Sequence, residues 1–564
     1  MKKFISIAII IFIIITVLVA CGVDANVDEP ATDTTDATDA RQPTSDLGEY
    51  RIQIIRQGTP ITDAENTVVG QYIRDRFNIV FDFISYAGDI RDRQSIMLAG
   101  GDFNEIQYMQ RDDIVSAYIG AGALLDLEQF QHLMPDFWQR FETQIPLWRV
   151  VGNGTLYKWE THVPLMGETD MSFYDMFVRS DVLEYYGWPT LVSTSEWIEF
   201  LKQAVIDFPE SSGLPTVGVA VNFGDPWGLA GLSQILYEKS DHYINLGNEG
   251  VLFNTLTDRF EGIFDNPDVK DSFRFFNALY RYGLLDLESF TDTTERLEEK
   301  AHSGVALSIF YVNWFPQGGI PAYRQYVNMP IQSDAMVARG AGRQIRQETT
   351  RDFDSYGITT NARYPERIAE LLNWAASDEG QIVLRSGLEG VHWERDATTG
   401  RRTFTESRRQ SLLENDPNWN LNVGLNEFSP FLAHFNMLAD DGQYHDLLVH
   451  ADYYDQFFLT PRQREAVEML GWENSMSWWI DNMVPNPTGL MGAVHIDSTT
   501  ELGRLHQQMT DMRVRWTARL IMASSVDEFY SLYEEAMAEY NMLDHQSVID
   551  EFNRLLDEAR AALG

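Results

Sequence analysis

Residues 50–109 read YRIQIIRQGTPITDAENTVVGQYIRDRFNIVFDFISYAGDIRDRQSIMLAGGDFNEIQYM. Apolar and polar residues alternate at the start of this segment, and apolar residues with helical spacing follow, so strand-like and helix-like patterns succeed each other. They predict a strand over 50–55, a helix over 62–77, a strand over 79–84, a helix through 97–98 and a strand over 106–109. Strands and helices in this order predict a parallel α/β sheet.

The same kinds of pattern continue through the rest of the chain, with longer and more aromatic helices. Helices are predicted over 193–208, 268–282, 364–377, 378–386, 460–469 and 526–563. Strands are predicted over 172–178, 217–222, 305–312 and 326–330. No segment recurs at a fixed period, and the length of the chain predicts two or more ordinary domains.

The N-terminus has the features of a processed bacterial leader. Lys2 and Lys3 precede an apolar run over 4–20, which ends in LVACG at 18–22 and resembles a lipobox. The run is long enough to cross a bilayer, so an uncleaved anchor helix is the alternative. Because Gly22 and a polar stretch follow Cys21, we favour cleavage of the signal peptide over 1–20 and lipid attachment (palmitate) at Cys21.

Residues 21–47 are rich in Asp, Thr and Ala and contain almost no large apolar side chains. A segment of this composition cannot bury enough apolar surface to fold, so we predict a disordered tether. The chain beyond it is expected to work at the extracellular face of the cell membrane, attached through the N-terminal lipid.

Composition excludes several classes of function. The 84 acidic and 43 basic residues give a formal net charge of −41 at pH 7, which repels nucleic acid and anionic lipid headgroups. Cys21 is the only cysteine, so the chain has no intrachain disulfide and no cysteine-based metal site. The 44% hydrophobic content is ample for large packed cores.

An ordered series of short segments resembles one known family. The segments are MLAGGDF at 97–103, AGALLDL at 121–127, FVRSDVL at 177–183 with YGWPT at 186–190, YPER at 364–367, LLNW at 371–374 with Glu379 and Gly380, and GLEGVHW at 387–393. Together with the lipobox and the acidic tether, the series resembles the extracellular solute-binding lipoproteins of ABC importers, specifically the long carbohydrate-type (family 1) group.

The resemblance implies a periplasmic-binding-protein-like fold of α/β class: a two-lobed clamshell (type II) whose discontinuous lobes are joined by hinge strands. Transferred to this chain, lobe 1 takes residues 48–174 plus 332–400. Lobe 2 takes residues 175–331 plus 401–564, including the C-terminal helices. The chain is expected to cross between the lobes near 171–177 and to return near 326–330.

The resemblance also implies a binding function without catalysis. A monomeric receptor, tethered to the membrane, would capture an oligosaccharide or glycoside by closure of the clamshell and deliver it to the transmembrane subunits of an ABC permease. The sequence predicts no cofactor and no metal-ligating residues, and a bound calcium ion stays open at this stage.

Tryptophans are the candidate stacking residues, because sugar sites combine aromatic platforms with polar side chains. Trp314 follows the strand over 305–312, where the family commonly has an aromatic residue that stacks on the ligand. Trp227 follows the strand over 217–222, at the edge where α/β proteins gather their sites. Trp159 precedes the first expected crossing, and Trp393 lies in the segment GLEGVHW. A packing role in the core is the alternative for each. Trp188 and Trp197 are expected in the core.

Polar candidates also follow predicted strands. Thr59 comes after the first strand, and Arg111 and Asp112 come directly after the strand over 106–109. A solvated charge cluster is the alternative reading of this pair. Asp170 and Ser172, near the expected crossing, complete the predicted ligand-binding set.

Two other functions stay open at this stage. The sequence has no Gly-x-Ser-x-Gly elbow, no His-Glu-x-x-His, no phosphate-binding glycine loop and no dinucleotide fingerprint. Paired carboxylates of a secreted lipoprotein glycoside hydrolase cannot be recognised without a structure, since their separation is three-dimensional. A peptide-binding ABC receptor would share the clamshell.

Overall fold

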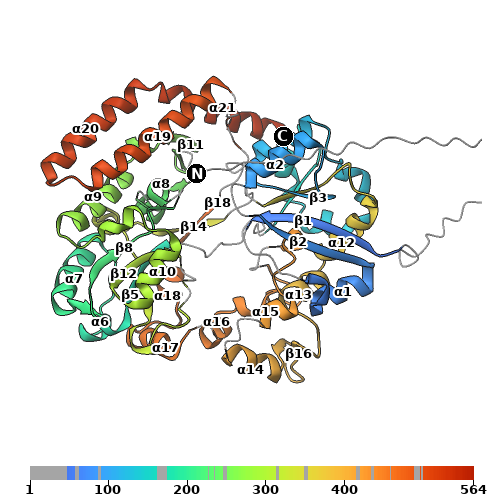
Figure 1. Cartoon of the computed structure of the whole chain (residues 1–564), viewed down its shortest axis with the longest axis horizontal. Helices are drawn as coiled ribbons and strands as arrows, with labels where there is room; N and C mark the ends of the chain where they lie inside the picture. Colours follow the sequence, from blue (N-terminus) through green and yellow to red (C-terminus); the bar gives the residue numbers. More distant parts are fainter. Residues whose placement is uncertain are drawn as a thin grey trace, which may run out of the picture.

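The computed structural model describes residues 48–563 except 58–62, 87–89, 162–173, 226–227, 234, 246–249, 313–314, 316, 348–353, 415–418, 434–436, 458, 488–493, 495 and 497–499. The fold is a two-lobed α/β architecture, as expected. In Figure 1 the blue strands β1 to β3 belong to one lobe, and β5, β8 and β12 belong to the other.

The first lobe begins with β1 (Tyr50–Gln57) and β2 (Ile79–Tyr86), which pair in parallel. α1 (Val68–Phe77) connects them, then α2 (Ile90–Gly100) leads to β3 (Ile106–Met109). The predicted order of strands and helices over 50–109 is confirmed. α1 begins later than predicted, because Thr67 acts as its N-cap and accepts a hydrogen bond from the backbone N–H of Gly70.

β3 departs from the predicted parallel sheet. It pairs antiparallel with β15 (Ser355–Ile358), and β15 also pairs antiparallel with β4 (Trp159–Glu160). The first lobe is therefore mixed, because a strand from much later in the chain enters between β3 and β4.

The second lobe contains a four-stranded sheet in the order β13-β5-β12-β8. Its strands are β5 (Tyr174–Arg179), β8 (Val217–Ala220), β12 (Ala306–Val312) and β13 (Tyr326–Met329). β12 pairs in parallel with β8 and antiparallel with β5, and β13 pairs antiparallel with β5. All four strands lie within two residues of their predicted limits.

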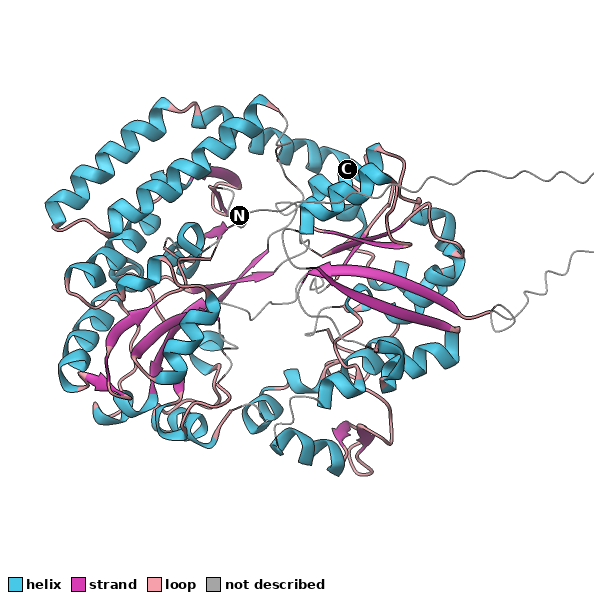
Figure 2. Cartoon of the chain, viewed as in Figure 1, coloured by secondary structure: helices cyan, strands magenta, loops and turns pink. Residues whose placement is uncertain are grey.

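Helices and small strands cover these sheets (Figure 2). Around the first lobe lie α3 (Asp112–Gly120), α4 (Pro135–Arg140), α5 (Ile145–Trp148), α12 (Pro365–Ala376), α13 (Asp378–Ser386), β16 (Trp393–Arg395), β17 (Arg402–Phe404), α14 (Glu406–Glu414) and α15 (Trp419–Val423). The second sheet is accompanied by α6 (Ser180–Tyr185), α7 (Thr194–Asp207), β6 (Glu210–Ser211), β7 (Leu214–Pro215), α8 (Gly228–Leu232), α9 (Pro267–Arg281), α10 (Thr294–Ser303), α11 (Asp334–Arg339), α17 (Pro461–Met469) and α18 (Ser477–Asn482). α16 (Ala451–Phe457) packs Tyr453 and Phe457 against Phe404 of β17.

A third unit has its own hydrophobic core. The strands β9 (Tyr243–Asn245), β10 (Val251–Asn254) and β11 (Arg259–Gly262) pack with α19 (Glu501–Ile521), α20 (Val526–Met542) and α21 (His545–Leu563). The helix predicted over 526–563 is therefore two helices separated at Leu543 and Asp544. α19 was not predicted.

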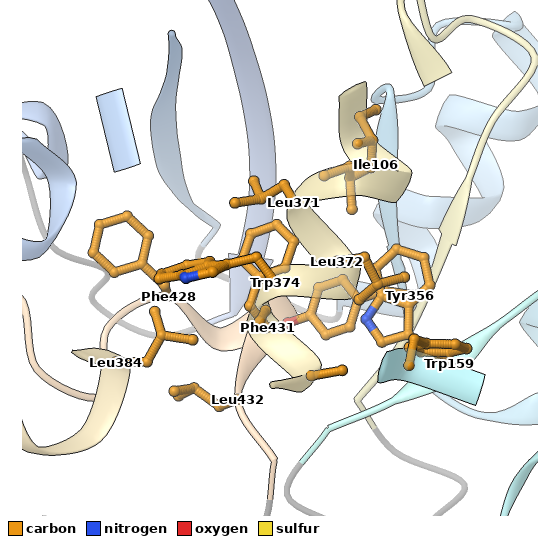
Figure 3. Packing of buried hydrophobic residues seen from close by; sticks show 14 of the residues in the cluster. Ile106, Trp159, Tyr356, Leu371, Leu372, Trp374, Leu384, Phe428, Phe431 and Leu432 are labelled. Carbon is orange, nitrogen blue, oxygen red and sulfur yellow. The ribbon is translucent and has the colours of Figure 1, made fainter. Parts of the chain in front are cut away.

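The first core draws on distant parts of the chain. Figure 3 shows Leu371 and Trp374 of α12 beside Phe428 and Phe431 of a later segment. In the same cluster, Ile106 comes from the N-terminal third of the chain. A separate core under the second sheet contains Trp188 and Trp197, so their predicted core positions are confirmed.

β14 (Arg343–Gln347) and β18 (Met483–Pro487) pair in parallel and lie between the lobes in Figure 1. β14 follows α11, whose Met336 packs in the second core, and β15 of the first lobe comes next in the chain. The chain therefore passes from the second lobe to the first through β14. This passage comes later in the chain than 326–330, the position that we expected. β13, at that expected position, is an edge strand of the second sheet.

The predicted limits of the lobes stay a prediction, although two segments lie differently. Met336 packs in the second core, whereas the limits place it in lobe 1. Residues 423–433 and Met437 contribute to the first core, whereas the limits place them in lobe 2. Among the described residues, no helix combines the length and the hydrophobicity that a bilayer crossing needs. Cys21 and the predicted tether lie outside the described residues.

Candidate ligand-binding site

The strand pairings place several chain ends at one edge of the first lobe. Ser355, the first residue of β15, lies opposite Met109 at the end of β3 and opposite Glu160 at the end of β4. Thr161, which follows β4, and Asp354, which precedes β15, therefore lie at this edge, and the Thr161 N–H donates to the Asp354 carbonyl at 3.3 Å. Sites in α/β proteins form at such strand ends.

A buried ion cluster lies at this edge. The Lys158 ammonium contacts the Asp112 carboxylate, lies 2.7 Å from Glu160 Oε1 and donates a 3.4 Å hydrogen bond to Ser355 Oγ. Burial by itself lowers the pKa of Lys158, but the Coulombic attraction of Asp112 and Glu160 outweighs it and raises the pKa above its ordinary value. Lys158 therefore stays charged at neutral pH and ties α3 to β4 and β15.

Three aromatic rings lie beside the ion cluster. Tyr356 has its ring centroid 5.3 Å from that of Tyr108 and 6.1 Å from that of Trp159, to which it is nearly parallel. The Tyr108 hydroxyl donates to Asp354 Oδ1 at 2.9 Å, and Trp159 Nε1 donates to the Pro430 carbonyl at 2.6 Å. The hydrogen bonds and the ion cluster hold this edge rigid, which lowers the cost of ordering it around a ligand.

The second sheet has a corresponding edge. Val312 at the end of β12 lies opposite Tyr174 at the start of β5, and β8 ends at Ala220, opposite Ile309 of β12. Asp175, fully buried, has its Oδ1 3.2 Å from the Lys239 ammonium and accepts a 2.8 Å hydrogen bond from Trp479 Nε1 at Oδ2. Each lobe therefore carries a buried lysine–carboxylate pair at the edge where its strands end.

The turn after β8 is also fixed by polar contacts. Asn222 Nδ2 donates to Asp225 Oδ2 at 2.8 Å and to Thr294 Oγ1 at 2.9 Å. The Thr294 hydroxyl in turn donates to Asp225. These bonds tie the turn to the first residue of α10.

No protein-family model matches the chain, and no curated protein matches it in sequence. Solved structures do match it. An alginate-binding protein, solved without calcium ion, has a TM-score of 0.60 at 15% identity, over 90% of this chain and 98% of that protein. The chain has the fold of this alginate-binding protein.

Two further structures with this fold are substrate-binding proteins of ABC transporters by name. One, from Bifidobacterium longum infantis, binds HMO and has a TM-score of 0.59 at 13% identity, over 91% of this chain and 99% of that protein. The other is FusA of S. pneumoniae, an EF-hand mutant in complex with fructo-nystose, with a TM-score of 0.61 at 14% identity over the same shares. The expected resemblance to solute-binding proteins is confirmed at the level of the fold.

Four of the predicted ligand residues lie in the described part of the chain. Arg111 has a positive φ of 78° and precedes α3, and Asp112 belongs to the Lys158 ion cluster. Trp159, next in sequence to Lys158, is 2% exposed, so its rings present almost no surface to a ligand. The structure thus brings Asp112 and Trp159 to one edge. Their role in binding stays a prediction.

Trp393 lies away from this edge. It is buried in a small cluster with Phe404 and Leu447, and its Nε1 donates to the Gly387 carbonyl at 2.9 Å. Thr59, Asp170, Ser172, Trp227 and Trp314 lie outside the described residues, so their placement in the site stays a prediction as well.

Sequence reasoning missed the residues that order these edges: Tyr108, Lys158, Asp175, Lys239, Tyr356 and Trp479. One signal was available for two of them. Lysine is rare in this chain, so Lys158 and Lys239 stand out in sequence. The aromatic residues gave no such signal, because their partners are set by strand pairings between distant segments.

Among the described residues, one group of carboxylates has the spacing of metal ligands: Asp286, Glu288 and Asp292. The Lys300 ammonium lies 2.6 Å from Asp286, 2.8 Å from Glu288 and 2.5 Å from Asp292. Because a cation already binds all three carboxylates, the cluster is an internal ion network that ties α10 to the preceding loop.

His392, beside Trp393, gives a pH-dependent prediction. Burial, with a smaller contribution from the positive charge of Arg408, lowers the pKa of His392 to about 4. A depressed histidine pKa stabilises the fold above the unfolded-state value of about 6.5 and loses this contribution as the pH falls toward 4. We expect the wild type to lose roughly 2 kcal/mol between about pH 6 and pH 4.5 through this residue.

The measurement is urea unfolding at a series of pH values, compared between the wild type and His392→Asn. The asparagine oxygen can replace Nδ1, which accepts a 2.8 Å hydrogen bond from the Leu388 N–H. The variant should show a flatter pH profile over this range. Parallel profiles for the two proteins would contradict the prediction.

Proposed function

We propose that the protein is the extracellular substrate-binding protein of an ABC importer, tethered to the membrane through lipid at Cys21. It captures an oligosaccharide or glycoside between its two lobes and delivers the ligand to the permease. One observation carries the proposal: structures named as sugar-binding or ABC-transporter-associated match about nine-tenths of this chain and nearly all of their own length.

The described edges suit binding rather than catalysis. A glycoside hydrolase of the usual kind needs one carboxyl group as an acid and a second as a base or nucleophile. Here Asp112 and Glu160 are both bound by the Lys158 ammonium, and Asp175 is bound by Lys239 and Trp479. In these contacts the three carboxylates order the two edges, and each of them is already held by a lysine. The neighbouring structures are binding proteins by name.

Closure of the lobes would provide the mechanism. The lobes are linked through β14, which pairs with β18, so a small rotation at this two-stranded ribbon can open or close them. A ligand that contacts both edges favours the closed form, and only differential contact with the two forms shifts the equilibrium. The permease would then recognise the closed form.

The test is a thermal-shift screen of the full chain, purified in detergent, against oligosaccharides and peptides. A ligand that binds only the folded state stabilises it by about 2.7 kcal/mol at a hundredfold excess over Kd, and the melting temperature rises accordingly. We expect this rise with an oligosaccharide, and we expect mass spectrometry to recover that oligosaccharide uncleaved.

Trp314→Ala and Trp227→Ala should abolish or strongly weaken the shift, since a stacking aromatic contributes much of a sugar's binding energy. Tyr185→Ala, at an exposed site on α6, is the control and should bind normally. Cleavage products would instead support the hydrolase. A shift with peptides alone would support the peptide receptor.

A further inference from the structure

The second lobe contains a cavity of about 730 Å³ between its edge strand β13 and the helices α16 and α17. We call it the amide cavity. Its volume is within the range of small-molecule sites. Its lining includes Phe315, Gln317, Gln325, Asn328, Gln463 and Trp472.

The lining of the amide cavity is uncharged. Its described residues include aromatic rings, four side-chain amides and three hydroxyls, but no Asp, Glu, Lys or Arg. This is unusual in a chain with a net charge of −41, in which charged residues make up 23% of the sequence. A wall of aromatic rings and amides suits a neutral polyhydroxy ligand, and it offers nothing to neutralise an anionic one.

Two of the four amides are fully used by the protein. Gln317 donates through Nε2 to the Tyr326 carbonyl at 2.8 Å and accepts through Oε1 from the Tyr326 N–H at 2.6 Å. Gln463 donates to the same carbonyl at 3.2 Å and accepts from the Thr460 N–H at 3.0 Å. These two amides are structural, because they fix β13 against the neighbouring loop and α17.

The other two amides are not used in this way. The Gln325 side chain is 7% exposed. Its Oε1 atom and the Oδ1 atom of Asn328 are both buried, and neither accepts a hydrogen bond from a described residue. A buried carbonyl oxygen without a donor costs free energy. Rotation about the last side-chain torsion, which is soft, can turn either end of each amide toward the cavity. A sugar hydroxyl can then donate to the oxygen or accept from the nitrogen.

The amide cavity is linked to the edge of the second sheet. The Phe315 ring packs against Phe177 of β5 and Tyr326 of β13, with ring centroids 5.8 Å and 5.9 Å apart, so this side of the cavity lies along the strands. On the other side, half-buried Trp472 packs edge-on against Trp479, with ring centroids 5.8 Å apart, and Trp479 donates to Asp175 at that edge. A ligand at the edge therefore meets the cavity at Trp472 and reaches Gln325 only by following β13, because the Gln325 carbonyl accepts from the Ser180 N–H just after the end of β5.

We propose that the amide cavity is a subsite for one neutral sugar unit of the captured oligosaccharide, with Gln325 and Asn328 as its hydrogen-bonding residues and Trp472 as an aromatic wall. The inference rests on the proposed function and narrows it, because it selects neutral oligosaccharides over uronate or otherwise anionic ones. Gln325 and Asn328 act here by binding and take part in no reaction.

The test uses the full chain in detergent, with kestose, maltotetraose, cellotetraose and an alginate tetrasaccharide as probes in the thermal-shift screen. We expect a neutral probe to raise the melting temperature and the anionic alginate probe to have no effect. The neutral probe that gives the largest shift is then titrated against the double variant Gln325→Leu/Asn328→Leu. The loss of two hydrogen-bonding groups should weaken its binding at least tenfold. Gln507→Leu, at an exposed glutamine of α19, should bind like the wild type.

A stability measurement shows whether the double variant is folded and whether the amides are free. Because the variant removes buried oxygens that have no donor, its melting temperature without ligand should be unchanged or higher. Gln317→Leu breaks two hydrogen bonds to Tyr326 and should lower it. If the double variant and Gln317→Leu lower the melting temperature without ligand by the same amount, the proposal is overturned.

The other outcomes separate this inference from the proposed function. Binding of a neutral probe with the same affinity in the double variant overturns the subsite and leaves the importer function intact. Binding of the alginate probe alone has the same consequence. If no oligosaccharide raises the melting temperature, the proposed function fails and the subsite fails with it.

Discussion

Replacement of Lys158 by methionine should destabilise the protein by about 3–5 kcal/mol. The side chain is 2% exposed and is the cation of two carboxylates, those of Asp112 and Glu160, which are themselves almost fully buried. Removal of the cation leaves two like charges in a poorly solvated place. Because the pKa of Lys158 is raised, its contribution holds below about pH 10.4 and is lost in more alkaline solution, as the pH rises through the raised pKa.

Differential scanning calorimetry would show the loss as a lower melting temperature of the first lobe. Arg554→Met is the matched control, since Arg554 also binds two carboxylates, Glu551 and Glu558, but is 50% exposed. Its loss should be about 1 kcal/mol or less. The triple variant Lys158→Met/Asp112→Leu/Glu160→Leu should recover most of the stability, because no unpaired charge remains. Equal effects of the two single variants would contradict the burial argument.

Gly380→Ala should destabilise the protein by about 3 kcal/mol, at the upper end of overpacking effects. Gly380 lies in the first turn of α13, and a Cβ there would be 2.0 Å from the Trp374 carbonyl oxygen and 2.8 Å from Ala375 Cα. Both are backbone atoms of α12, so no change of side-chain rotamer can relieve the clash. The two helices would have to separate at Ser377.

Gly100→Ala is the control for this prediction. Gly100 ends α2, and a Cβ there would meet nothing within 4 Å. Alanine has the higher helix propensity and reduces the freedom of the unfolded chain, so this variant should be neutral or up to about 1 kcal/mol more stable. The measurement is the melting temperature of both variants and of the wild type. A Gly380→Ala protein as stable as the wild type would contradict the prediction and show that α12 and α13 can separate at little cost.

Local pattern was sufficient for the elements whose signals lie within the element. α13 begins and ends at the predicted residues, Asp378 and Ser386, because Ser377 caps it and Gly387 follows it with a positive φ. β3 likewise has its predicted limits. α19 was missed because its buried face includes Arg513 and Thr517, which interrupt the apolar pattern that sequence analysis depends on.

The candidate site was harder to predict, because its contacts join segments that are distant in sequence. Asp112 was identified as a residue at a strand end, but its partner Lys158 directly precedes β4, and β4 is placed by its pairing with β15. The sequence likewise does not show which amides of the amide cavity are hydrogen-bonded. Gln317 binds the backbone of Tyr326, whereas Gln325 Oε1 accepts no hydrogen bond within the described part of the chain, and both are glutamines in the same loop region.

The composition of the first core constrains the order in which the chain can fold. Tyr50 and Met437 belong to the same cluster, so nearly four hundred residues separate its first member from its last. At ordinary rates of translation this interval lasts roughly 20–80 s. Until Phe428 and Phe431 emerge from the ribosome, the apolar faces of β2 and α12 lack their cover. A protein that crosses a membrane before it folds, as the proposed function requires, gains from such a delay, because its N-terminal half remains open while export proceeds.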